Sequence, residues 1–582
     1  MSTQAKKYLG ITAPINLNPP SDLDLELTAS LLQALEELGY TESQEESKKR
    51  EAVLGRLHLM VKDFVREVGI AQGLPDFVVA EAGGKIFTFG SYRLGVHRSG
   101  ADIDTLCVVP QHVSRADFFS TFASHLQQAP EVTEVTAVPD AYVPVIKMKF
   151  SDIPIDLVFA SLKMPTIPED LNLLDHSHLR NLDEKCILSL NGSRTTDEIL
   201  KLVPNVATFH TALKCIKVWA QRRGLYSNSL GYLAGVASAM LVARICQLYP
   251  NASASTIVSR FFRIYCQWNW PQPVLLKPIE EVSFLAQMKV WNPKIYPPDR
   301  LHRMPVITPA FPSMCSTHNV SISTQAVITA EFKRGMEVMN EIEERKASWS
   351  KLFAKSEFFY TYKNYIQIIG LSRTHEQHKI WSGYLESRIR HFTTKLEYVT
   401  HIAGAPPFPE MFECSGMERE AVLAKHFHQQ QQQEEIVQPA EEPQVFSACF
   451  YVALSIGPKQ TPGPIKLDIH SQVTDFREFV TKWDGFLEGM DLVIRDIKRD
   501  DLPDYLFEGA ERPPKLTKRA PKKPEELQPV AAVDSLPPVA SPLSPHSHSI
   551  CSTKRVKEET SPTGKEGLSS PRHTSGNHLD AK

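Results

Sequence analysis

The chain has 582 residues, 42% of them hydrophobic, which is too long for one core and enough for about three globular domains. Its formal net charge of −3 gives no general attraction to nucleic acid, so any such contact must come from local basic patches. No apolar run is long enough to span a bilayer, and we expect neither a secretion signal nor membrane association. Nine scattered cysteines without a Cys-x-x-Cys pair are typical of a reducing compartment and argue against a disulfide framework or a zinc site.

The first third of the chain combines helices with strands. Apolar residues at helical spacing predict one helix over 21–38 and a second that ends before Gly69. A stretch rich in apolar, β-prone segments follows from residue 85 to about 162. We therefore expect a mixed sheet with helices over residues 1–204, although the first two helices can also pack on the next domain.

Helical periodicity returns at residue 205 and changes again near residue 350. The middle part is expected to be mainly helical, with the clearest helices over 208–223 and 230–248. Beyond it the pattern predicts a strand, a helix, a strand, a helix and a strand in turn, over 358–369, 375–399, 446–456, 471–486 and 492–498. This order is typical of a small α/β sandwich of the ferredoxin or RRM kind.

The last part of the chain is rich in proline, serine and lysine and lacks aromatic residues, so we expect it to be disordered. The predicted fold class is α+β multidomain. The boundaries are 1–204 for the sheet domain, 205–345 for the helical middle domain, 346–505 for the RRM-like domain and 506–582 for a basic tail.

The most informative motif is Gly90-Ser91, followed after ten intervening residues by Asp102-Ile103-Asp104. Side chains alternate along a strand, so both carboxylates project from one face while Ile103 points into the core. Two adjacent carboxylates repel each other unless a cation lies between them. Hard divalent cations such as Mg²⁺ bind oxygen-only sites of this kind and hold phosphates there.

A third acid, Asp156, lies in the middle of the apolar run Ile153-Pro-Ile-Asp-Leu-Val-Phe, where an unpaired carboxylate would be costly to bury. The glycine of the Gly-Ser turn allows backbone N–H groups to approach a triphosphate, and Ser91 adds a hydroxyl. A lone Asp-x-Asp is more often an ordinary pair of strand-end acids on a solvated face. The turn at this spacing, together with Asp156, favours a metal site instead.

These motifs carry a family resemblance. The arrangement resembles that of the DNA polymerase β-like nucleotidyltransferases, and the longer string Phe89-Gly-Ser-Tyr-Arg-Leu-Gly-Val-His97 resembles eukaryotic nuclear poly(A) polymerases. Further matches include Ser189-Leu-Asn-Gly-Ser-Arg194 and Cys246-Gln-Leu-Tyr-Pro-Asn-Ala252, and the likeness runs from about residue 8 to about residue 500. The resemblance implies a palm-like catalytic sheet and template-independent transfer of AMP from ATP to an RNA 3′-hydroxyl, with release of pyrophosphate.

The resemblance also implies residue roles. Asp102 and Asp104 would hold two Mg²⁺ ions, which Mn²⁺ can replace, and Asp156 would help to hold the ion nearer the primer and serve as the base. The ATP-binding positions implied by the family are Phe89, Gly90, Ser91, Arg98, Asp102, Ile103, Asp104, Tyr142, Asp156, Lys217, Tyr226, Asn228, Gly235 and Val236. Two alternatives stay open, because Lys217 can belong to a solvated helix face and Gly235 and Val236 can serve helix packing alone.

The resemblance implies a nuclear, monomeric catalytic unit that works with RNA, ATP and proteins of the pre-mRNA cleavage and polyadenylation complex. Basic clusters at 515–523 and 554–557 match what nuclear import receptors bind. Tyr360, Tyr362 and Tyr365 could stack on bases or form sheet core. The alternatives in function are a terminal uridylyl or tRNA nucleotidyltransferase and a catalytically inactive RNA-binding scaffold, which the intact acids argue against.

Overall fold

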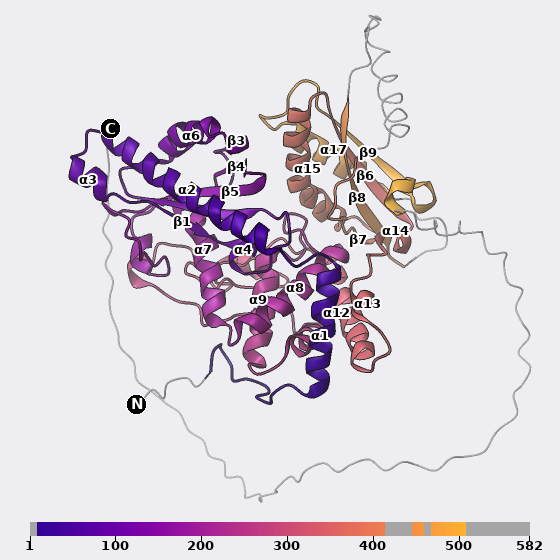
Figure 1. The fold of residues 1–582 in the computed structure, drawn as a ribbon. Coiled ribbons are helices and arrows are strands. Elements are labelled where there is room, and N and C mark those ends of the chain that lie inside the picture. The colour runs from indigo at the N-terminus through magenta and orange to yellow at the C-terminus, as the bar shows by residue number, and fades with distance from the viewer. Residues whose placement is uncertain (1–7, 414–444, 459–466, 508–582) are drawn as a thin grey trace, which may run out of the picture. The chain divides into compact units, whose positions relative to one another are not determined.

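A computed structural model describes residues 8–413, 445–458 and 467–507 (Figure 1). All of them belong to the first of two units into which the chain divides, residues 1–515 and residues 516–582. The predicted disordered tail, its two basic clusters and most of the glutamine-rich insertion lie outside the described residues. Within the described part, no helix combines the length and the apolar character that crossing a membrane requires.

Three helices precede the first sheet: α1 (Asp22–Glu37), α2 (Gln44–Ala71) and α3 (Asp76–Glu81). The two long helices begin at serine N-caps, Ser21 and Ser43, each of which forms a reciprocal capping box with an acid three residues later. They pack in different places, since α1 contacts helices of the middle domain whereas α2 covers the sheet. α1 thus lies against the helices of the middle part of the chain, and α2 lies against the sheet.

The first sheet has five strands in the order β1-β2-β5-β4-β3. The strands are β1 (Lys85–Thr88), β2 (Ile103–Val109), β3 (Val132–Val138), β4 (Val145–Phe150) and β5 (Ile153–Ser161). Only β2 and β5 run parallel, and the other neighbours are antiparallel. One face packs on α2, on a π-helical turn over Phe118–Phe122 and on α6 (Ala123–Gln128), and the other packs on α7 (Glu184–Leu202). The predicted mixed, palm-like sheet is confirmed.

The middle of the chain is helical, as predicted. Its main helices are α8 (Val206–Arg222), α9 (Gly235–Leu248), α10 (Ala254–Cys266) and α12 (Ile322–Glu343), with short helices α11 (Pro297–Arg300) and α13 (Trp349–Leu352). α9 is buried almost throughout, which explains its near-continuous apolar sequence. Together with α1 these helices surround a core that includes Trp219, Phe261 and Phe332.

The C-terminal part forms a four-stranded antiparallel sheet in the order β7-β8-β6-β9. Its elements are α14 (Phe358–Thr361), β6 (Asn364–Ser372), α15 (His375–Leu396), β7 (Ile402–Gly404), β8 (Phe446–Ile456), α17 (His470–Thr481) and β9 (Asp491–Lys498). α15 and α17 cover one face of this sheet (Figure 1).

Two details of this sheet differ from the sequence prediction. The run predicted as a strand from residue 358 begins as helix α14, because Phe358 and Phe359 turn inward to pack against the face of the sheet that α15 leaves open. Tyr365 is fully buried, and its hydroxyl donates to the carbonyl oxygen of Phe358 at 2.9 Å. Tyr360 and Tyr362 pack against the same cluster, so the three tyrosines belong to the sheet core rather than to a base-stacking surface.

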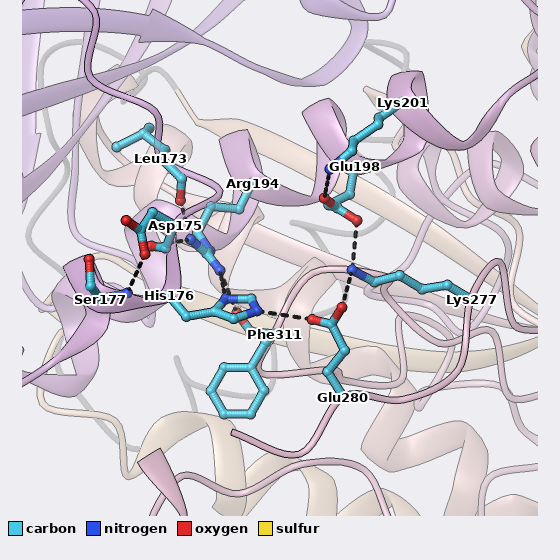
Figure 2. Close-up of polar contacts among 10 residues, drawn as sticks. All are labelled: Leu173, Asp175, His176, Ser177, Arg194, Glu198, Lys201, Lys277, Glu280 and Phe311. Carbon is cyan, nitrogen blue, oxygen red and sulfur yellow. Dashed lines mark hydrogen bonds and ion pairs between the residues drawn. The ribbon is translucent and has the colours of Figure 1, made fainter. Parts of the chain in front are cut away.

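A buried polar network joins α7 to the middle domain (Figure 2). The guanidinium of Arg194, 1% exposed, donates to the carbonyl oxygens of Leu173 and Asp175 and, at 3.3 Å, to that of Phe311. It also donates to Nδ1 of His176 at 2.9 Å, which leaves Nε2 of His176 to face Glu280 at 3.0 Å. Burial lowers the pKa of Arg194 to about 10, far above neutrality, so the arginine stays charged.

The network continues through Lys277, whose ammonium lies 2.7 Å from a carboxylate oxygen of Glu198 and 2.9 Å from one of Glu280. α7 therefore supplies Arg194 and Glu198, and the middle domain supplies Lys277, Glu280 and the Phe311 carbonyl (Figure 2). The buried charges of Arg194 and Glu198 thus meet partly buried groups of matching charge, which is what a charge in the interior requires. This junction holds α7, which packs on one face of the sheet.

Candidate active site

Three carboxylates meet at one end of the sheet. Asp104 on β2 is directly opposite Asp156 on β5 in the parallel register, and Asp102 precedes β2 by one residue. One oxygen from each of the three carboxylates lies within 4.8 Å of the other two. Asp102 is exposed and the other two are half-buried, while Ile103 is fully buried as its alternation predicts. The side chain of Ile103 thus serves the core, and only its backbone can face a nucleotide.

The electrostatics of this cluster favour a divalent cation. Burial, and then the charges of Asp102 and Asp156, raise the pKa of Asp104 to about 7, while Lys147 and Lys217 oppose the rise. Three carboxylates at this spacing repel each other when all are ionised. An oxygen-only donor set in which one carboxyl group holds its proton more tightly than usual fits a hard cation that replaces the proton.

Lys147 is a part of this site that sequence reasoning missed. It lies opposite Asp156 on the neighbouring strand β4, and its ammonium is 2.5 Å from Oδ2 of Asp156. About half of its side chain is exposed, so the lysine partly neutralises Asp156 without being fixed in the core. The alternation Val-Ile-Lys-Met-Lys-Phe places it on the polar face, but which strand pairs with β4 cannot be read from that alternation.

The Gly90-Ser91 turn packs directly on the acids. Gly90 has a φ of +61°, and a Cβ added there would lie 2.0 Å from Oδ2 of Asp104, so both conformation and space demand glycine. The N–H of Phe89 donates to the carbonyl oxygen of Asp104 at 3.0 Å. The ring of Phe89 lies against Gly192 of α7, where any Cβ would come within 2.8 Å of it. α4 (Gly90–Arg93), a single turn, therefore begins beside the acids with Ser91 half-buried.

Lys217, on α8, also lies near the acids. Its side chain is 8% exposed and its ammonium donates to the carbonyl oxygen of Val96 at 3.3 Å, so it does not belong to a solvated helix face. Burial lowers the pKa of this lysine, whereas Asp102 and Asp104 raise it. A buried ammonium beside a carboxylate cluster is placed to meet anionic oxygens that the cluster binds through a cation.

Tyr226 and Asn228 come from the loop between α8 and α9. Burial, with the charges of Asp102 and Asp104, raises the pKa of Tyr226 to about 12, so its phenol stays a donor. Its hydroxyl lies over Gly235, where a Cβ would be 2.8 Å away. The side-chain oxygen of Asn228 is buried without a hydrogen-bond partner among the described residues. Such an atom is costly unless a ligand satisfies it.

The loop that carries Asn228 is held from two directions. The side-chain amide of Asn319 donates to the carbonyl oxygen of Asn228 at 3.0 Å, and the hydroxyl of Ser229 donates to Glu386 of α15 at 3.4 Å. Gly235 and Val236 begin α9, whose N-cap residue Ala234 makes no side-chain capping bond, and Val236 is 36% exposed. Packing on Tyr226 thus accounts for Gly235, whereas Val236 is left at the surface.

Two predicted nucleotide-binding residues stand apart from this cluster. Tyr142, between β3 and β4, is 71% exposed. Arg98 is exposed in the loop before Asp102, although its positive charge repels that of Lys217 and adds to the lowering of the pKa of that lysine by burial. The structure therefore brings together the acids, Lys217 and Tyr226, with the turn at Gly90 packed on Asp104.

Comparison with known proteins identifies the family of this chain. Family models match in succession the "Poly(A) polymerase nucleotidyltransferase domain" over residues 10–203, the "Poly(A) polymerase central domain" over 208–355 and the "Poly(A) polymerase predicted RNA binding domain" over 357–516. The chain belongs to the poly(A) polymerase family. It is 44% identical over 544 residues to poly(A) polymerase pla1 of Schizosaccharomyces pombe, covering 88% of this chain and 96% of that protein.

Further relatives support the same membership. The chain is 45% identical to poly(A) polymerase PAPalpha of Candida albicans over 89% of its own length and 95% of that protein. A poly(A) polymerase of Dictyostelium discoideum is also 45% identical, over 89% of this chain and 62% of the longer relative. The prediction of a template-independent polymerase built on a nucleotidyltransferase fold is confirmed.

Proposed function

We propose that this poly(A) polymerase transfers AMP from ATP to the 3′-hydroxyl of RNA with the help of Mg²⁺ ions held by Asp102, Asp104 and Asp156. The observation that carries the proposal is the meeting of these carboxylates within 4.8 Å at the end of two parallel strands. Their oxygen-only donor set suits Mg²⁺, and Mn²⁺ can replace it.

The chemistry is an in-line displacement. The 3′-oxygen of the RNA attacks the α-phosphorus of ATP, the bond to the bridging oxygen breaks, and its electron pair leaves with pyrophosphate. Asp156 accepts the proton of the 3′-hydroxyl, because its half-buried carboxylate lies in the acid cluster, with the ammonium of Lys147 beside it. Bound Mg²⁺ would stabilise negative charge on the attacking and leaving oxygens.

The remaining residues position the nucleotide. Lys217 and the hydroxyl of Tyr226 donate to the phosphates, and the turn at Gly90-Ser91 presents a backbone N–H and a hydroxyl to them. The unpartnered oxygen of Asn228 accepts from the amino group of adenine. Tyr142, exposed in the loop between β3 and β4, closes on the base by stacking.

A pair of matched variants tests the role of the acids. Asp156→Asn should reduce extension of oligo(A) with ATP and Mg²⁺ at least a thousandfold while the melting temperature stays near that of the wild type. Asp152→Asn is the control, because Asp152 is 96% exposed in the turn just before β5 and does not belong to the cluster. Near-normal extension by a folded Asp156→Asn protein would refute the assignment.

Nucleotide selectivity separates this function from uridylyl transfer. We expect ATP to be preferred strongly over UTP, CTP and GTP. The buried oxygen of Asn228 needs an amino donor, which distinguishes ATP from UTP, and stacking of Tyr142 on the larger purine base distinguishes ATP from CTP. Asn228→Ala should reduce this preference. Primer extension with each nucleotide alone measures both, and comparable incorporation of UTP by the wild type would assign the chain to uridylyl transfer.

We propose further that RNA contacts the C-terminal domain and that the enzyme works in the nucleus. α15 carries Arg388 and Arg390, whose buried Nε atoms have no hydrogen-bond partner in the described part of the chain. Import receptors would bind the basic clusters at 515–523 and 554–557, and proteins of the cleavage and polyadenylation complex would deliver the RNA. The catalytic unit acts as a monomer.

A further inference from the structure

A cavity of about 810 Å³ adjoins the nucleotide site on the side of Arg98 and Tyr226. Its wall comes from the end of α8 and from segments of the chain far apart in sequence, 355–360, 408–412 and 505–507. The volume is several times that of a single water molecule and is large enough for a small hydrated anion.

Cations line the cavity near the active site. Arg98, Arg222 and Lys355 reach its wall, together with the carboxylates Glu357 and Glu410. Burial raises the pKa of Glu410, and the positive charge of Lys355 acts against that rise. Neither Arg98 nor Arg222 has a side-chain ion pair or hydrogen bond within the described residues, and their positive charge is therefore not balanced locally.

Tyr40 lies near both of these arginines. Burial raises the pKa of its phenol, and the charges of Arg98 and Arg222 both act against that rise. The hydroxyl of Tyr40 also hydrogen-bonds the side-chain oxygen of Gln221. Two guanidinium groups thus flank one partly buried phenol, and all three residues line the cavity.

Electrostatic contacts continue from this point to the acids. Tyr226, which lines the cavity, lies within the field of Asp102, Asp104 and Tyr40. Arg98 acts on Lys217, which in turn lies within the field of Asp102 and Asp104. Three donors therefore line the cavity, Tyr226, Arg98 and Arg222, and the charge of the carboxylate cluster acts on Tyr226.

We propose that this cavity binds the product pyrophosphate through Arg98 and Arg222 after the bond to the α-phosphorus has broken, and that pyrophosphate leaves the enzyme by this route. The inference rests on the proposed function. Inorganic pyrophosphate carries multiple negative charges and many acceptor oxygens, and guanidinium groups bind such oxygens in pairs. Arg98 and Tyr226, both proposed to bind the nucleotide, line the cavity.

The aromatic part of the wall favours an anion over a nucleobase. Phe359 lies within ring-packing distance of Phe408, at 4.9 Å, and of Phe412, at 6.0 Å, so these rings are already engaged with one another. They belong to the core between the C-terminal sheet and helix α14. A base would have to displace these contacts in order to stack, whereas a hydrated anion needs only the polar side of the cavity.

The test uses Arg222→Ala, because Arg222 reaches the cavity and takes no part in the chemistry of the acids. Oligo(A) extension by the full-length enzyme with Mg²⁺ gives the KM for ATP and the inhibition constant for added pyrophosphate. We expect the inhibition constant to rise roughly tenfold, the loss of one charge-assisted contact, with the KM for ATP unchanged. Arg222→Lys should give a smaller rise, and Arg260→Ala, a surface arginine stacked on Tyr249 outside the cavity, should give none.

Three results would overturn the proposal. An unchanged inhibition constant means that the cavity does not hold pyrophosphate. A rise in the KM for ATP alone assigns the cavity to entry of the nucleotide, and a parallel rise in both constants means that Arg222 already acts on the triphosphate before bond breaking. Failure of the wild-type enzyme to extend oligo(A) at all would instead refute the proposed function, so the two hypotheses fail differently.

Discussion

Replacing Gly90 by alanine tests whether the packing of the Gly-Ser turn on Asp104 sets the geometry of the acids. The new Cβ would lie 2.0 Å from Oδ2 of Asp104, which is at least 1 Å closer than any real Cβ contact of 3.0 Å. The carboxylate must therefore move by about 1 Å or the turn must open. Moving the carboxylate changes its spacing from Asp156, its partner across the two parallel strands, and opening the turn withdraws Gly90 and Ser91 from the acids.

The cost has two parts. Forcing a residue with a Cβ to keep a φ of +61° costs roughly 1–2 kcal/mol. Displacing a catalytic group by about 1 Å commonly reduces the rate on the order of a hundredfold. Gly39→Ala is the matched control, because Gly39 also has a positive φ, +74°, but an added Cβ there meets nothing within 4 Å. It should lose similar stability and keep its activity.

The assay is single-turnover extension of oligo(A) with saturating ATP and Mg²⁺, accompanied by a thermal melt of each variant. Both variants should melt at similarly reduced temperatures, and only Gly90→Ala should lose about two orders of magnitude in rate. Gly90→Ala that extends oligo(A) as fast as Gly39→Ala would show that the turn does not set the position of Asp104. The reasoning from packing would then be wrong even if the acids are catalytic.

The remaining predictions concern charge and the tail. The pKa of Asp104 is raised from 3.8 to about 7 in the folded protein, so the stability that its protonated form contributes is lost as the pH rises through that range. Mg²⁺ should therefore raise the melting temperature at about pH 8 and scarcely at about pH 5. Equal shifts at the two pH values would contradict this. Lys147→Ala should lower the single-turnover rate of extension about tenfold, because Asp156 loses its cationic partner, whereas Lys149→Ala on the same strand, which removes only a pair with Glu134 of β3, should not. Equal rates for the two variants would contradict this. Truncation after about residue 510 should preserve extension and abolish nuclear accumulation of a tagged protein, and undiminished nuclear fluorescence would reject the import role.

The parts of the site that follow a local period could be predicted from the sequence. Asp102 and Asp104 share a face because strand side chains alternate, and that alternation also buries Ile103. Asp156 could be placed on a strand for the same reason. That this strand lies parallel and in register with β2 is a long-range fact, and the local pattern does not contain it.

Features that depend on long-range pairing could not be predicted. Lys147 belongs to the site because β4 pairs with β5, which places it opposite Asp156. Lys217 lies in a segment with the spacing of an ordinary amphipathic helix. Its ammonium is buried against the carbonyl oxygen of Val96, more than a hundred residues earlier in the chain. The strand predicted from residue 358 begins as a helix because aromatic propensity fits a sheet and a packed turn equally well.

The polar network around Arg194 has a consequence for recombination between relatives of this enzyme. A crossover near residue 204 looks harmless, because it falls between two family-model domains. It would nevertheless separate Arg194 and Glu198 from Lys277 and Glu280, whose charges they match in the interior (Figure 2). A chimaera whose two parents differ at these positions would leave a buried charge without its partner, so these residues must be inherited together.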